Sequence, residues 1–242
     1  MKNYFFSFLL AILFTSCQVT ETINLNEDGS GTIEAMQLRD EHSYMLLMGE
    51  KYSKEDKFQD TTYVFRDYIT KYNEIFLKYT QREQQLFQKY ANAKVHVKKS
   101  SFDKEFKTSI TFPFTKIDAV PNLYNTEDYA NDLENNYALT AESHFFDLKY
   151  SFDGTTFKRI VKVINEAEIK KNKRQINNFK SKFNILSFTQ TYALKYNFPR
   201  KIKSVSNSAA ILSSDKKTVT LTFQLSDCLE NPESTNLEVV LE

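Results

Sequence analysis

Residues 19–37 read VTETINLNEDGSGTIEAMQ, and this stretch decides the fold class. Val19, Ile23 and Leu25 recur at even spacing, as in a strand with one buried face. The break at 26–31 contains an Asp-Gly pair, which favours a tight turn because glycine takes positive φ angles freely. Its acidic residues lack the D-x-D-x-D-G spacing of a calcium loop. We therefore predict a β-hairpin.

The segment before this hairpin is MKNYFFSFLLAILFTSC, residues 1–17. It starts with a positive charge, continues with an apolar run from Tyr4 to Phe14, and ends on two small residues before Cys17. This is the order of a secretory signal, and the run is shorter than the roughly 20 residues of a membrane span. With its cysteine, the segment resembles a bacterial lipoprotein signal, although Phe14 replaces the usual leucine. An ordinary signal peptide that contains a cysteine is the alternative.

The lipoprotein interpretation divides the chain into two parts. Residues 1–16 are expected to be a signal peptide that is removed, and residues 17–242 to form a single α+β envelope domain. Cys17 is then the lipid-attachment residue, which carries acyl chains such as palmitate and anchors the protein in a bilayer. Gln18 stands where aspartate is associated with inner-membrane retention. We therefore predict a lipid-anchored envelope protein, in the outer membrane rather than the inner one.

From residue 62 to residue 90 the apolar side chains follow helical spacing. They recur at i, i+3, i+4 and i+7, which predicts one long amphipathic helix with an aromatic stripe. Tyr72, Phe76 and Tyr79 lie near the middle of this stripe and are expected to point at the sheet. Two interpretations stay open, because the stripe could fill the core under the sheet or line a groove for an apolar ligand.

The rest of the chain alternates predicted strands with shorter helices. Pro113 has no N–H to donate, so the strand that contains it is expected to end at a sheet edge or to leave the sheet. Asn165-x-x-Glu168 resembles a capping box that opens a second, basic helix. The predicted strands lie near 93–99, 105–114, 146–152, 157–163, 188–198, 219–225 and 237–241, and the helices at 126–135 and 165–183. This order favours an α+β class, with antiparallel strands built from hairpins and covered by the long helix and the basic helix.

Both ends of the chain carry a family resemblance. The cysteine, the strand, the Asn-Glu-Asp-Gly-Ser-Gly turn and the return strand occupy 17–37, and YNFPRKIKSVSN at 196–207 precedes a hairpin around 215–220. This order resembles a group of uncharacterised envelope lipoproteins of Bacteroidota-type bacteria, which are distantly similar to LppM-type lipoproteins. The resemblance implies an envelope location and a fold class, but no activity.

Composition excludes several classes of function. Only Lys2 of the 32 basic residues lies in the signal, so the remaining charges balance the 31 acidic residues. That balance argues against a protein that binds nucleic acid by bulk charge. With Cys17 acylated, Cys228 has no disulfide partner within the chain and is expected to be a buried, inert thiol. Four glycines are too few for a phosphate-binding loop of the usual kind.

No catalytic motif appears, so we predict a protein that is not an enzyme. The histidines lie far apart without ligand spacing, so neither a metal nor a cofactor is predicted; they are His42, His96 and His144. The predicted function is a membrane-anchored binding or interaction module, with the bilayer and an envelope protein or apolar ligand as partners. The alternative is a carrier or sensor of a lipid-like ligand, lined by Tyr72, Phe76 and Tyr79. A hydrolase is a more distant alternative.

Overall fold

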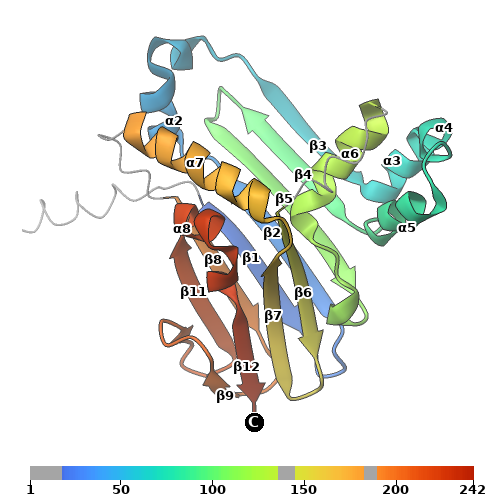
Figure 1. Ribbon diagram of the computed structural model, residues 1–242, viewed down its shortest axis with the longest axis vertical. Helices are drawn as coiled ribbons and strands as arrows, with labels where there is room; N and C mark the ends of the chain where they lie inside the picture. The colour runs from blue at the N-terminus through green and yellow to red at the C-terminus, as the bar shows by residue number, and fades with distance from the viewer. Residues whose placement is uncertain (1–17, 136–144, 183–189) are drawn as a thin grey trace, which may run out of the picture.

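Two β-sheets and their covering helices make up the computed structural model, which describes residues 18–135, 145–182 and 190–242 (Figure 1). The larger sheet has the order β10–β11–β8–β1–β2–β5–β4–β3, with β1 (Gln18–Leu25), β2 (Gly31–Leu38), β3 (Phe58–Val64), β4 (Lys94–Ser100), β5 (Glu105–Phe114), β8 (Thr191–Asn197), β10 (Ile211–Leu212) and β11 (Thr218–Gln224). The smaller sheet has the order β6–β7–β12–β9, with β6 (Phe146–Phe152), β7 (Thr156–Val163), β9 (Ile202–Val205) and β12 (Leu237–Leu241). All neighbouring strands are antiparallel except β1 and β8, which are parallel.

The predicted hairpin at 19–37 is confirmed as β1 and β2, at the centre of the larger sheet. Gly29 has a φ of 80°, and the Asp28 carboxylate accepts hydrogen bonds from the backbone N–H and the hydroxyl of Ser30. A Cβ atom at Gly31 would lie 2.0 Å from the backbone oxygen of Asn24, so only glycine fits where the strands meet. The turn therefore depends on both glycines, for different reasons.

Several other elements lie where alternation and capping predicted them. Strands β4 to β7 and β11 to β12 fall within a few residues of their predicted bounds, as do α6 (Thr126–Asn135) and α7 (Glu166–Lys182). The Asn165 side chain accepts from the backbone N–H of Glu168 at 3.1 Å, as a cap does. Pairing between β4 and β5 ends at Thr111, so Pro113 lies where β5 pairs with β2 alone. The α+β class is confirmed, with antiparallel pairing dominant in both sheets.

The continuous helix predicted over 62–90 is wrong. The stretch contains the end of β3 and then three short helices, α3 (Phe65–Lys71), α4 (Asn73–Phe76) and α5 (Gln81–Lys89). Residues 62–64 pair with β4 as an edge strand, which suits their β-branched and aromatic side chains. Thr80 starts a new helix because it forms a capping box with Glu83. The apolar residues keep helical spacing within α3, α4 and α5, so the sequence pattern is continuous although the helix is not.

The sequence pattern predicts no helix or strand in the connection between β2 and β3. It forms α2 (Glu41–Met48) and a 3₁₀ helix, η1 (Gly49–Lys54). Arg39 holds this segment in place, because its guanidinium pairs with Glu41 and Glu55 and lies 3.2 Å from the Phe106 ring centroid. These contacts fasten α2 and η1 to the beginning of β5.

The two sheets face each other, and the helices extend the layer in front (Figure 1). The smaller sheet lies in front of the lower part of the larger one, with α7 and α8 (Leu225–Glu230) above it, while α6 crosses in front of β4 and β5. Among the described residues, 3₁₀ helices also connect these elements: η2 (Ile117–Ala119), η3 (Leu123–Asn125) and η5 (Pro232–Thr235). A single apolar core runs through both halves and includes Ile23, Phe65, Phe112 and Phe157.

Candidate functional site

A charged side chain lies inside the sandwich of the two sheets. Glu21 belongs to β1, where its neighbours on the inward face are Ile23 and Leu25, and its side chain is only 1% exposed. A buried carboxylate is costly unless it is paired and hydrogen-bonded. The groups that surround Glu21 therefore define the most unusual polar site in the described chain.

Four tyrosine hydroxyls lie within hydrogen-bond distance of the Glu21 carboxylate. Tyr150 and Tyr196 donate to Oε1, at 2.8 and 2.5 Å. Tyr192 and Tyr124 approach Oε2, at 2.8 and 3.1 Å. These tyrosines come from β6, β8 and η3. The carboxylate thus joins the larger sheet, the smaller sheet and the connection that follows β5.

Arg159 of β7 completes the pairing. It is the cross-strand neighbour of Tyr150, is 3% exposed, and reaches both oxygens of Glu21 through Nε at 3.2 Å and Nη2 at 3.4 Å. Nη1 donates to the backbone oxygen and the hydroxyl of Thr235, at 3.2 and 2.7 Å, and Nη2 also donates to Tyr192 at 2.7 Å. Every guanidinium nitrogen therefore has an acceptor. The Glu21 cluster is defined as Glu21, Tyr124, Tyr150, Arg159, Tyr192, Tyr196 and Thr235.

The electrostatics keep both charges of this cluster in place. Burial alone would raise the pKa of Glu21, but the Arg159 charge and the hydrogen bonds outweigh it and hold that pKa below its usual value. Burial opposes the charge of Arg159, yet Glu21 raises the pKa of Arg159 well above its usual range. Burial also raises the pKa of all four tyrosines, with the Glu21 charge adding to the effect. At neutral pH the cluster is a carboxylate, a guanidinium and four neutral phenols.

A pocket of about 300 Å³ opens beside the Glu21 cluster. It lies where β1 begins and β2 ends, under α8 and η5, and we call it the α8 pocket. Its volume is at the lower end of the range for small-molecule sites, about 300–1,000 Å³. Its lining residues are Val19, Gln37, Phe146, Val161, Leu225, Cys228, Leu229 and Pro232, together with Tyr124, Arg159, Tyr192 and Thr235 of the cluster.

The chemistry of the α8 pocket is mainly apolar contact. Arg159 lies in its wall, but Glu21, Tyr192 and Thr235 already accept from all of its nitrogens. Cys228 is buried and free, and burial raises the pKa of its thiol to about 11, so it is protonated at neutral pH. The prediction of a buried Cys228 is confirmed. The pocket thus presents aliphatic and aromatic carbon, a neutral thiol and a neutralised charge pair.

The predicted site residues lie elsewhere. Cys17 is outside the described residues. Phe76 is 8% exposed and packs on Phe87, with ring centroids 6.1 Å apart. Tyr72 donates to the Glu134 carboxylate at 2.8 Å, and Tyr79 donates to a backbone oxygen of α6 at 3.2 Å. The structure therefore places these three side chains against α5 and α6, away from the α8 pocket.

The histidines do not converge in the described chain. His96 contacts Asp60 at 2.9 Å on the exposed part of the larger sheet, His42 is exposed, and His144 lies outside the described residues. Within residues 18–135, 145–182 and 190–242, no group of three or more His, Cys, Asp or Glu side chains is placed to hold a metal ion.

Sequence reasoning missed the Glu21 cluster, although a local signal was present. In β1 the even spacing of Val19, Ile23 and Leu25 has Glu21 at the position between them. In β7 the inward positions Phe157 and Val161 likewise enclose an arginine, Arg159. Charged residues at inward positions of two alternating strands are a sign of a buried ion pair. Their pairing could not be found from spacing, because Glu21 and Arg159 are 138 positions apart.

Comparisons with known proteins add a distant structural likeness. No protein-family profile and no curated protein match this chain. The folded domain of the LppM protein of Mycobacterium tuberculosis, determined by NMR, is similar at 11% sequence identity and a TM-score of 0.41, over 96% of this chain and 94% of that one. Among the described residues, no helix is both long and apolar enough to cross a membrane.

Proposed function

We propose that this protein is a lipid-anchored binding module of the cell envelope, which takes an apolar, lipid-like ligand into the α8 pocket. The anchor is Cys17, at the end of the lipoprotein-type signal. The observation that carries the ligand proposal is the pocket itself, whose wall is mostly apolar and whose volume is about 300 Å³. A cavity of this kind with a few polar groups is the usual form of a small-molecule site.

The saturated Glu21 cluster supports binding rather than chemistry. A general base or nucleophile needs a free lone pair or an exchangeable proton within reach of its substrate. Both oxygens of Glu21 are surrounded by donors, and Arg159 has no nitrogen left without an acceptor. The Arg159 charge is also neutralised, so the pocket wall does not favour an anionic group. The proposed ligand therefore enters with its apolar part first.

The ligand proposal is tested with N-phenyl-1-naphthylamine, an uncharged probe that fluoresces in apolar surroundings. Cys228→Phe and Leu229→Trp each place a larger side chain in the α8 pocket, and we expect both to abolish the fluorescence gain of the wild-type protein. Phe76→Ala alters the aromatic stripe instead and is expected to leave probe binding unchanged. Circular dichroism confirms that each variant remains folded.

Two results would contradict this assignment. Unchanged probe binding in both pocket-filling variants would remove the α8 pocket as the site. Loss of binding in Phe76→Ala alone would favour the other arrangement, a groove lined by Tyr72, Phe76 and Tyr79.

The anchor is tested separately in cells that express the full chain. Metabolic labelling with a fatty acid should mark the wild-type protein and fail to mark Cys17→Ser, because the thiol is the proposed attachment atom. Cys228→Ser is the matched control and should remain labelled. Equal labelling of wild-type and Cys17→Ser proteins would show that Cys17 is not the lipidated residue.

A further inference from the structure

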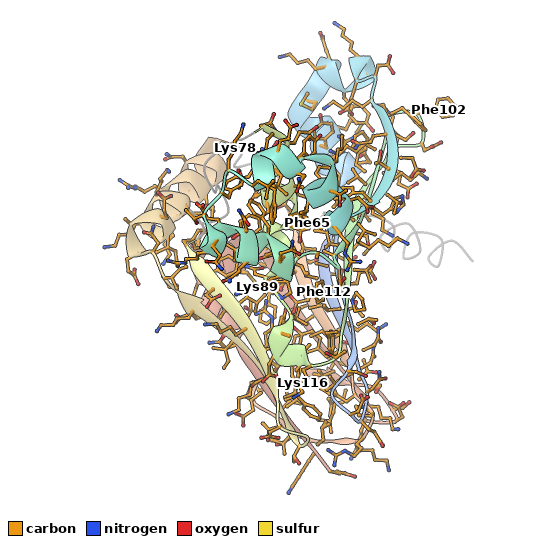
Figure 2. All side chains as sticks on the ribbon, turned by 90° about the vertical axis from the view of Figure 1, so that its right-hand side faces the viewer. Phe65, Lys78, Lys89, Phe102, Phe112 and Lys116 are labelled. Carbon is orange, nitrogen blue, oxygen red and sulfur yellow. The ribbon has the colours of Figure 1, made fainter. Side chains whose placement is uncertain are left out.

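Two phenylalanines are exposed at one end of the larger sheet. Phe102 lies in the turn between β4 and β5 and is 94% exposed, and Phe58 begins β3 and is 79% exposed. The backbone of Lys57 bonds with Ser101 in both directions, so the two segments are held together. We call this end, residues 57–58 and 101–104, the tip. Figure 2 shows Phe102 projecting sideways from the upper part of the molecule, below the level of the helical segment α2 and η1.

The tip belongs to the end of the sheet at which β1 begins. Gln18 pairs with Leu38, and Leu38 pairs with Lys107, so the first residue of β1 is level with Lys107 of β5. From β1 to β4 there are three strand spacings, or about 15 Å. Strand β5 extends two residues beyond Lys107, about 7 Å, before the turn that carries Phe102 begins. The tip is therefore near the proposed anchor and projects further than Gln18 does.

Lysines and carboxylates both lie around the tip. Lys57 directly precedes Phe58, and Lys104, two residues after Phe102, has its ammonium nitrogen 4.3 Å from the Tyr52 ring centroid. Asp56 is exposed beside Lys57, Asp103 accepts from Ser100 at 3.0 Å, and Glu105 pairs with Lys98. Exposed aromatic rings beside lysines are typical of segments that enter the headgroup region of a membrane. Single exposed apolar residues are ordinary, but two held together at the anchored end are not explained by packing.

We propose that the tip is a membrane-contact surface, which inserts Phe58 and Phe102 among lipid headgroups beside the Cys17 anchor. This inference rests on the proposed lipid anchor. The contact fixes the orientation of the domain, which attachment at one point would leave free. It also turns the end of the sandwich that contains the α8 pocket toward the bilayer, because Val19 and Gln37 of that pocket are next to Gln18 and Leu38.

Tryptophan fluorescence tests the tip, since the chain contains no tryptophan. The lipidated full chain is reconstituted in vesicles of phosphatidylcholine and phosphatidylglycerol, with Phe102→Trp as the probe. Ile211→Trp is the matched control. Ile211 is 71% exposed, and it pairs with Thr220, near the end of β11 that lies away from the tip. We expect Phe102→Trp emission to shift to shorter wavelength and to be quenched several-fold more strongly by brominated lipids. Equal quenching of the two variants would overturn the proposal.

A second measurement separates the tip from the anchor. The chain from Gln18 onward contains every strand and helix described, and its folding is checked by circular dichroism before vesicles are added. We expect vesicles to shift Phe102→Trp emission even without Cys17, and Phe58→Ser to weaken that shift. If the full chain does not attach to vesicles, the anchor fails while this measurement still decides the tip. A shift that needs no lipid and grows with protein concentration would show a contact between copies instead.

Discussion

The Glu21 cluster and the aromatic cluster around Phe87 both consist largely of aromatic side chains. Around Phe87 of α5, rings from α3, α4, α6 and the turn before α5 pack at centroid distances between 4.9 and 6.4 Å, and they belong to Phe65, Phe76, Tyr129 and Tyr79. The hydroxyls of Tyr79 and Tyr90 each donate to one backbone oxygen, of Asp132 in α6 and of Asn122 before η3. In the Glu21 cluster the tyrosines turn their hydroxyls inward, onto one carboxylate.

The difference shows how tyrosine serves two kinds of core. In the helical half the ring fills space, and the hydroxyl needs only one backbone acceptor. Between the sheets the hydroxyl contributes most to stability, because the four tyrosine donors and Arg159 together compensate for burying the Glu21 charge. The first arrangement depends on shape, whereas the second depends on a complete set of hydrogen bonds. Mutations should therefore affect the two halves in different ways.

The largest effect is expected from Arg159→Met. The change leaves the Glu21 carboxylate buried without its counter-charge, and such a loss costs about 3–5 kcal/mol of unfolding free energy. Adding Glu21→Gln should recover much of that loss, because the amide is neutral and its oxygen still accepts from two tyrosines. Urea unfolding of both single variants, the double variant and the wild type measures the coupling. Simple additivity of the two changes would contradict the pairing of Glu21 with Arg159.

In the aromatic half, Phe87→Ala should cost about 3 kcal/mol, because a large buried ring leaves a cavity that closes only partly. This is the lower part of the range for phenylalanine, since the surrounding helices α3 to α5 are short and can shift inward. Urea unfolding gives the free energy, and Phe87→Leu is the control that keeps much of the volume. A loss below about 1 kcal/mol would mean that this half is loosely packed.

Local chemistry explains which elements could be predicted from the sequence. Turns that need glycine and strands that alternate are encoded within ten or so neighbours, so the hairpin at Gly29 and the helix at Thr126 were recoverable. The division of residues 62–90 into a strand end and three short helices was not, although the Thr80–Glu83 capping box marks a new helix start within the stretch. Periodicity continued across that cap, and the pairing of residues 62–64 with β4 decides the strand from outside the segment.

The Glu21 cluster is harder to predict from the sequence for the same reason. Glu21 meets Tyr196 across 175 positions, and no local pattern connects two residues that far apart. The only local signal is that Glu21, a charged residue, interrupts the apolar inward positions of an alternating strand. The aromatic stripe gives a stronger local signal, because its spacing is regular. Its members Tyr72 and Tyr79 bond to α6, an element that was predicted correctly but without a packing partner.

A matched pair of tyrosines measures the value of burial. Tyr196 and Tyr72 both donate to a glutamate carboxylate, but the first bond is buried and the second is exposed. Tyr196→Phe should cost about 1.5–3 kcal/mol, as expected for a hydrogen bond to a charged group. Tyr72→Phe should change stability by less than about 0.5 kcal/mol, as surface substitutions usually do. Denaturant midpoints of the two variants test this, and equal losses would show that burial does not distinguish the two bonds.

The smallest effect is a pH dependence that belongs to Glu21 alone. Its pKa is lower in the folded protein than in the unfolded chain, so its ionised form stabilises the fold. That contribution is complete above the ordinary glutamate pKa of about 4.3 and is lost as the pH falls from there through the lower folded value. Other carboxylates with lowered pKa values, such as Asp28 and Glu55, titrate in the same region.

We therefore expect the difference in unfolding free energy between the wild type and Glu21→Gln to be constant from pH 7 to about pH 5 and to shrink below about pH 4.3, since the other groups cancel in the difference. Urea unfolding at a series of pH values measures it. A difference that stays the same down to the acid transition would mean that Glu21 does not titrate between the two states, and that its six close donors stabilise it by shape and hydrogen bonding without a net charge.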